Sequence, residues 1–81
     1  MTINKVRQKL NQLKKDKKFI EIEKILSTSN LSEREYWLLK YCYIKDLMVE
    51  NICPRLSISR PYYHIVKNIA LTKVEFYNTD L

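Results

Sequence analysis

Residues 52–71 read ICPRLSISRPYYHIVKNIAL, and this stretch decides the fold that the sequence predicts. Ile52 and Leu56 lie four residues apart, the spacing that places two side chains on one face of a helix. Residues 56–58 then make a corner, and Ser59 is of the type that caps the first turn of a helix. The second helix turns an apolar stripe inward, made of Tyr63, Val66 and Ala70. A short helix, a tight turn and a second helix form a helix-turn-helix.

The outward face of the second helix carries polar side chains that suit contact with DNA. The first turns of a recognition helix reach base edges in the major groove. Arg60 or Lys67 could contact guanine, and Asn68 could contact adenine. Tyr62 could touch a phosphate or a thymine methyl group, and His64 is a further candidate contact. A solvated helix face explains each of these residues taken alone.

The predicted turn is surrounded by Arg55, Ser57 and Ser59. A cation, two hydroxyl groups and the amide-rich start of a helix are all suited to binding phosphate. For Ser59 the capping role by itself accounts for the residue. These three residues are therefore added to the candidate DNA contacts.

Length and composition narrow the fold class. The chain has 81 residues, enough for one modest core, so residues 1–81 are expected to form a single helical domain. It has no glycine and only two prolines, which excludes a glycine-rich phosphate loop and leaves little material for strand turns. The predicted fold is all-α, with four or five helices and a helix-turn-helix in a core over residues 31–77.

The charge favours a polyanionic partner or an acidic protein surface, although it also serves solubility. The formal net charge is +6 at pH 7, and residues 1–30 hold 8 Lys/Arg against 3 Asp/Glu. A basic cluster at the end of the first predicted helix supplies candidate phosphate contacts, namely Lys14, Lys15, Lys17 and Lys18. Ordinary solvation of a helix end explains the same cluster.

The sequence gives no sign of catalysis. It has one histidine, no paired carboxylates in an apolar setting and no nucleophile with a nearby base. Cys42 and Cys53 form no CxxC pair and read as buried, reduced thiols, so we expect no metal site and no cofactor. No stretch resembles a signal peptide or a membrane span, which predicts a cytoplasmic protein without membrane contact.

The basic N-terminal segment, residues 1–28, has helical spacing. A first helix is predicted by an apolar stripe made of Ile3, Val6, Leu10 and Leu13. The stripe then shifts, which favours a second helix over residues 17–26, capped by Asp16 after a break near residues 16–18. A single continuous helix, whose apolar stripe shifts around its axis, explains the same residues. The first stripe could pack into the core or pair with a second copy, which would make a homodimer.

Further along, the sequence marks a helix start most clearly at Ser32, because Glu35 completes a capping box with it. This helix runs to about residue 44 or 45, and its apolar residues cover more than one face, which predicts a central position. The next helix, over residues 47–56, contains Pro54, which either kinks it or divides it into two short turns. The last helix runs from residue 60 to about 77, with an inward stripe of Tyr63, Val66, Ala70, Val74 and Tyr77.

Several short motifs in residues 31–71 occur in a familiar order: LSERE at 31–35, an aromatic-rich helix, NIC at 51–53 and LSIS at 56–59. This order resembles the region-four DNA-binding domain of sigma factors. Within that group, residues 56–71 are most similar to the phage late-transcription regulators of Gram-positive bacteria, of the RinA and ArpU type. In those regulators an L-x-I-S turn precedes an aromatic pair and then a basic residue before Ala-Leu. The resemblance implies a transcription regulator from a phage or mobile element.

Together these patterns predict a small DNA-binding transcription regulator. It would insert the helix that begins near Arg60 into the major groove of double-stranded DNA. The alternative is a protein-interaction module of the same fold that binds the host's RNA polymerase, sigma factor or a defence protein. An exposed apolar patch around Leu71, Phe76 or the stripe over residues 3–13 would mark that alternative. RNA binding is a third hypothesis, for which the chain lacks the usual aromatic residues on a sheet.

Overall fold

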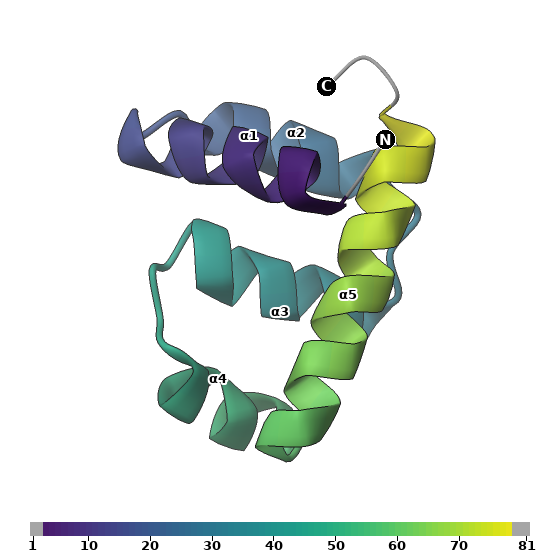
Figure 1. The fold of residues 1–81 in the computed structure, drawn as a ribbon. Coiled ribbons are helices and arrows are strands. Elements are labelled where there is room, and N and C mark those ends of the chain that lie inside the picture. The colour runs from purple at the N-terminus through teal and green to yellow at the C-terminus, as the bar shows by residue number, and fades with distance from the viewer. Residues whose placement is uncertain (1–2, 79–81) are drawn as a thin grey trace.

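The computed structural model describes residues 3–78, and this part of the chain forms five helices and no strand. The helices are α1 (Ile3–Lys15), α2 (Phe19–Ser27), α3 (Glu33–Tyr43), α4 (Val49–Leu56) and α5 (Arg60–Tyr77). The prediction of an all-α fold with four or five helices is confirmed. Figure 1 shows α1 and α2 side by side as an antiparallel pair, α3 beneath them, α4 at the far end and α5 along one edge.

The break between α1 and α2 confirms the two-helix interpretation of the N-terminal segment. Lys17 adopts a left-handed conformation with φ of 58°, and the Lys18 amide donates back to the Leu13 carbonyl at 2.9 Å. The predicted cap at Asp16 is wrong. Its carboxylate instead accepts a hydrogen bond from Gln12 at 3.1 Å, and the residue before α2 is Lys18, whose side chain makes no capping bond.

The core lies where α3 meets the other four helices, as its apolar residues on several faces predicted. Leu38 and Leu39 of α3 have no exposed surface. The α1 stripe is buried in the same core through Val6, Leu10 and Leu13. The hypothesis that this stripe pairs with a second copy is therefore wrong, because its own chain already covers it.

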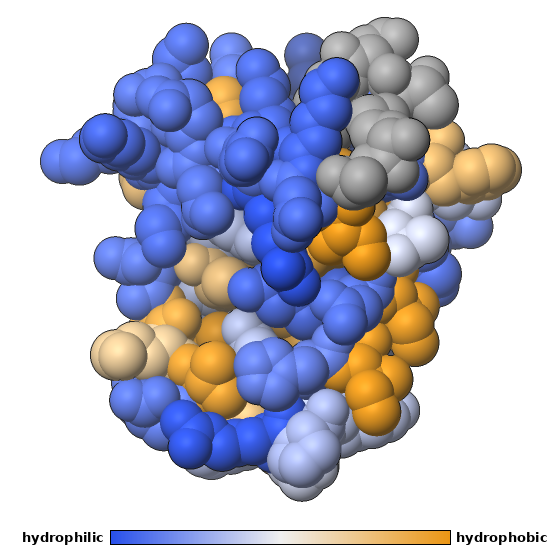
Figure 2. All heavy atoms as spheres, viewed as in Figure 1, coloured by the Kyte–Doolittle hydropathy of each residue, from blue (hydrophilic) through white to orange (hydrophobic). Residues whose placement is uncertain are grey.

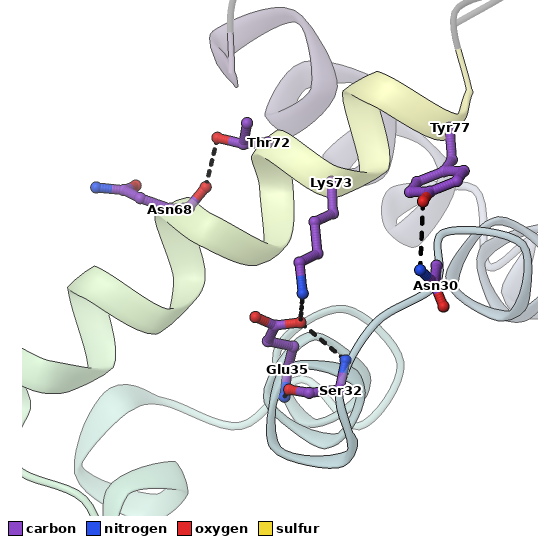
Figure 3. A network of polar contacts seen from close by, with 7 residues as sticks. All are labelled: Asn30, Ser32, Glu35, Asn68, Thr72, Lys73 and Tyr77. Carbon is purple, nitrogen blue, oxygen red and sulfur yellow. Dashed lines mark hydrogen bonds and ion pairs between the residues drawn. The ribbon is translucent and has the colours of Figure 1, made fainter.

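The start of α3 is fixed by the predicted capping box. The Ser32 hydroxyl accepts from the Glu35 amide at 3.3 Å, and the Glu35 carboxylate accepts from the Ser32 amide at 2.8 Å. The same carboxylate pairs with Lys73 of α5 at 2.8 Å, as Figure 3 shows. Burial of the Glu35 carboxyl raises its pKa, but the bonds from Lys73 and the Ser32 amide outweigh burial, so the pKa is lower than its ordinary value.

This lowered pKa makes Glu35 a source of acid sensitivity. Ionised Glu35 stabilises the fold at pH values above its pKa in the unfolded chain, and that contribution is lost as the pH falls through the lower, folded-state pKa. We therefore expect Glu35→Gln to lose less stability than the parent protein between about pH 5 and pH 3. Urea unfolding at a series of pH values measures this. Glu33→Gln, on the exposed side of the same turn, is the matched control and should keep the parent's pH dependence.

The loop after α2 is anchored to the end of α5. Ser29 is fully buried, and its hydroxyl accepts from the Asn78 amide group at 2.8 Å. Asn30 donates to the Tyr77 hydroxyl at 3.2 Å (Figure 3). The polar composition of residues 27–30 predicted this loop but gave no sign that it would hold a helix end. These bonds tie the end of α5 to the loop after α2.

Two details of the C-terminal half differ from prediction. α4 begins at Val49 and continues through Pro54 to Leu56 without division, so the hypothesis of two short turns is wrong. Pro54 is exposed and sits near the helix end, where a missing amide costs only one intrahelical bond. On α5 the stripe Tyr63, Val66, Ala70 and Val74 is buried as predicted, but Tyr77 is exposed and Leu71 is fully buried.

Leu71 has no exposed surface, and α1 packs along α5. Arg7 of α1 donates to the side-chain oxygen of Asn68 at 3.0 Å, and Leu71 lies three residues after Asn68 on the same side of the helix. The prediction that Leu71 belongs to an exposed patch is therefore wrong.

Cys53 is buried and Cys42 is half-buried, and both are free thiols.

Candidate nucleic-acid interface

The turn between α4 and α5 is built by backbone hydrogen bonds around Ser57. This residue has φ of 56° and ψ of 45°, the left-handed conformation that commonly ends a helix. The Ser57 amide donates to the Pro54 carbonyl at 3.3 Å, and the Ile58 amide donates to the Cys53 carbonyl at 3.1 Å. These two bonds satisfy carbonyls at the end of α4 and turn the chain sharply toward α5.

The start of α5 is fixed by its first residues. Ser59 is extended, and its hydroxyl accepts a hydrogen bond from the Tyr62 amide at 3.3 Å. Pro61 lies in the first turn, where its missing amide removes no intrahelical bond. The capping role predicted for Ser59 is confirmed, and α5 therefore begins immediately after the turn.

Because Ser57 is exposed, substitutions there report mainly on backbone conformation. A β-branched residue pays about 1–2 kcal/mol to adopt the left-handed region, whereas glycine adopts it without strain. We expect the free energy of unfolding of Ser57→Val to lie about 1–2 kcal/mol below that of Ser57→Gly, and the glycine variant to exceed the parent protein by no more than about 1 kcal/mol. Chemical denaturation of the two variants measures the difference. Equal stability of the valine and glycine variants would contradict the turn.

Most of the candidate DNA contacts predicted from the sequence are exposed. They are Arg55, Ser57, Ser59, Arg60, Tyr62, His64 and Asn68. The turn at Ser57 and the start of α5 lie at one end of the molecule, the lower end in Figure 1, whereas Asn68 lies about two turns further along α5, beside α1. The Asn68 side-chain oxygen accepts from Arg7, so its amide group remains the side-chain donor.

Arg60 is held only loosely. It lies 3.7 Å from a carboxylate oxygen of Glu50, and the two side chains are 69% and 55% exposed. Exposed pairs of this kind contribute about 0–1 kcal/mol. The Arg60 guanidinium can therefore exchange this carboxylate for a phosphate or a guanine edge at little cost.

Lys67 differs from the other candidates because it is half-buried. Its ammonium group lies 5.4 Å from the centre of the Tyr43 ring and 5.8 Å from that of Tyr63. Burial raises the pKa of both phenols, so both rings remain neutral beneath the cation. The expectation that Lys67 points freely outward is wrong, since it also packs on the core.

One further cation joins the turn from a distant part of the sequence. Arg34, in the first turn of α3, lies over the Tyr62 ring at 5.7 Å. Together with Arg55 and Ser57 it lines a hollow between the start of α3 and the end of α4. No pattern in the sequence indicated this role, because Arg34 lies inside a capping-box motif that already explains Ser32 and Glu35.

The lysine cluster proposed for phosphate contact does not join this surface. Lys14, Lys15, Lys17 and Lys18 lie at the turn between α1 and α2, on the side of the molecule away from α5 (Figure 1). Lys14 also forms an ion pair with Asp46 at 2.8 Å, which ties α1 to the loop after α3. The other three lysines are exposed.

Apolar side chains also gather on the outer face of α5. Ile65 is 54% exposed, Ile69 46% and Phe76 72%, and Tyr62 continues the same face toward the turn. Figure 2 shows hydrophobic surface, in orange, along the edge that α5 forms. Sequence reasoning named Phe76 but missed Ile65 and Ile69, although their spacing from Tyr62 by three and seven residues indicates one shared face.

None of the known protein-family models matches this chain. No curated protein and no solved structure is significantly similar to it either. Within residues 3–78, no group of three or more His, Cys, Asp or Glu side chains could hold a metal ion. Within the same residues, no helix has both the length and the hydropathy needed to cross a membrane.

Proposed function

We propose that α4, the turn at Ser57 and α5 form a helix-turn-helix that binds double-stranded DNA and regulates transcription. The observation that carries this proposal is the exposure of the first turns of α5 beside the arginines that surround the turn. In a helix-turn-helix, that part of the second helix enters the major groove while the first helix lies across it.

The phosphate contacts come from three helices. Arg34 of α3, Arg55 of α4 and the hydroxyl groups of Ser57 and Ser59 lie around the start of α5. Guanidinium groups, hydroxyls and a helix N-terminus are the groups that bind phosphate oxygens in protein–DNA complexes. They would set the depth and register of α5 on the duplex.

The base contacts come from α5 itself. Arg60 can donate two hydrogen bonds to guanine, and Asn68 can use its amide group toward an adenine. Ile65 offers a methyl-rich surface that fits the methyl group of thymine. The resemblance of residues 31–71 to the region-four domain of sigma factors, and of residues 56–71 to phage late-transcription regulators, supports the same function and implies a regulator from a phage or mobile element.

The proposal is tested by fluorescence anisotropy of the purified protein with a pool of randomised duplexes, followed by sequencing of the bound fraction at increasing salt. Specific binding is expected to enrich one motif and to persist near physiological salt, while phosphate contacts give a negative slope of log affinity against log salt. A palindromic motif would indicate a dimer. Binding that enriches no motif and vanishes by physiological salt would contradict the proposal.

A second candidate is favoured by the apolar face of α5. Tyr62, Ile65, Ile69 and Phe76 form an apolar strip on an otherwise polar surface, a composition typical of protein interfaces. On this hypothesis α5 binds a protein such as the host's RNA polymerase, sigma factor or a defence protein. Ile69→Glu then abolishes binding to the purified partner, and Arg60→Ala leaves it unchanged.

A further inference from the structure

A groove lies on the side of the molecule away from α5, between the start of α2 and the end of α3. It has a volume of about 640 Å³, and its apolar wall is made by Phe19, Ile20 and Ile44. Ile20 is 86% exposed, the largest exposed fraction among the large apolar residues that are exposed within residues 3–78. An isoleucine in this position contributes little to the core. The favourable free energy of burying its side chain can therefore still be gained when a partner binds.

The rim of the groove is basic. Lys24 and Lys45 are exposed and form no ion pair within residues 3–78, whereas Lys40 pairs with Glu23 at 3.4 Å. Glu23 also accepts a hydrogen bond from the Tyr36 hydroxyl at 2.5 Å. Both of these partners of the carboxylate belong to the same chain, so its negative charge is already paired within the fold. The charges left for a partner on this rim are therefore positive.

A second hollow adjoins the first and shares Phe19 and Ile20 with it. Its remaining walls are Lys17, Lys18 and Glu21. Ile20 thus stands as an apolar ridge between two depressions, and five lysines and two glutamates surround the pair. Two members of the lysine cluster at the turn between α1 and α2, Lys17 and Lys18, belong to this second surface, away from the proposed DNA contacts.

We propose that this ridge and its basic rim bind an acidic amphipathic peptide segment of a partner protein, in the groove between α2 and α3. Large apolar side chains of the segment pack against Phe19, Ile20 and Ile44, and its carboxylates pair with Lys24 and Lys45. Apolar anchors surrounded by complementary charges are the arrangement that gives a protein interface both affinity and register.

Other occupants match the surface less well. A nucleic-acid backbone would pair with the lysines but would leave Ile20 in water. A second copy of this chain also carries a net charge of +6, and Arg34 lies beside its exposed apolar face on α5, over the Tyr62 ring. Two positive surfaces would then meet, which is unfavourable.

The test uses a displayed library of random peptides, selected on the full-length protein and counter-selected on Ile20→Glu. We expect enriched sequences that combine Asp and Glu with large apolar residues at helical spacing. A synthetic peptide of the enriched sequence should bind the parent protein at least about tenfold more tightly than Ile20→Glu or the double variant Lys24→Glu, Lys45→Glu. Because all three substituted side chains are exposed, circular dichroism should show an unchanged fold.

Arg60→Ala separates this proposal from the DNA-binding one, since it alters the start of α5 and should leave peptide affinity unchanged. Loss of DNA binding in that variant with intact peptide binding supports two separate surfaces. The proposal is overturned if no peptide is enriched over the counter-selection, if enriched peptides lack acidic residues, or if sedimentation shows a self-associated parent protein that Ile20→Glu renders monomeric.

Discussion

Leu39→Ala is expected to lower the free energy of unfolding by about 3 kcal/mol, within the range of about 2–5 kcal/mol found for buried leucines. Leu39 has no exposed surface and lies on α3, the helix that contacts all four others. Removing its side chain leaves a cavity that the surrounding helices cannot close without losing contacts elsewhere. Domains of this kind are stable by only about 5–15 kcal/mol, so the loss is a large share of the total.

Urea unfolding monitored by circular dichroism measures this effect. Ile20→Ala is the matched control, because it also removes a large aliphatic side chain, but from a position that is 86% exposed. We expect that variant to stay within about 0.5 kcal/mol of the parent protein. Similar losses in the two variants would show that α3 is not the centre of the core.

Arg60→Ala is expected to weaken binding to an enriched duplex by about 1–3 kcal/mol, which corresponds to roughly 5-fold to 150-fold in the dissociation constant. Arg60 lies at the start of α5, where a recognition helix meets base edges, and its exposed pair with Glu50 adds little to stability. The variant should therefore lose affinity without losing stability. Anisotropy titration and denaturation of the same preparation measure the two quantities separately.

Lys18→Ala is the control for charge alone. It removes one positive charge from the turn between α1 and α2, away from α5. We expect it to reduce affinity only slightly, and equally for enriched and random duplexes. If Arg60→Ala and Lys18→Ala weakened binding by the same amount, the effect of Arg60 would be electrostatic and α5 would not be reading the sequence.

The sequence predicted helix ends and turns well where they depend on hydrogen bonds between residues close together in the chain. The capping box of Ser32 and Glu35, the corner at Ser57 and the cap at Ser59 all occur as predicted, because each depends on bonds between residues a few positions apart. The end of α5 near Tyr77 and the break near Lys17 were also predicted. For the capping box, the corner, the cap and the break, the relevant partner lies within the same window of sequence.

Other predictions failed because the deciding partner lies far along the chain. Leu71 is fully buried and Tyr77 is exposed, whereas the sequence predicted the reverse. Burial along α5 depends on the helices that pack against it, α1 among them, and nothing in residues 60–77 indicates that packing. Lys67 lies over the rings of Tyr43 and Tyr63, and Tyr43 comes from another helix. Arg34 reaches the proposed interface only because α3 packs beside α4 and α5.

The sequence by itself determined that this chain is helical, where most helices begin and end, and that the start of α5 presents polar side chains. Those features follow from backbone hydrogen bonding and apolar periodicity, which act over one or two turns. Only the tertiary structure decided which surfaces remain exposed, because burial depends on which helices meet. It buried the α1 stripe, placed Arg34 beside the turn, and left Ile20 and the apolar face of α5 in solvent.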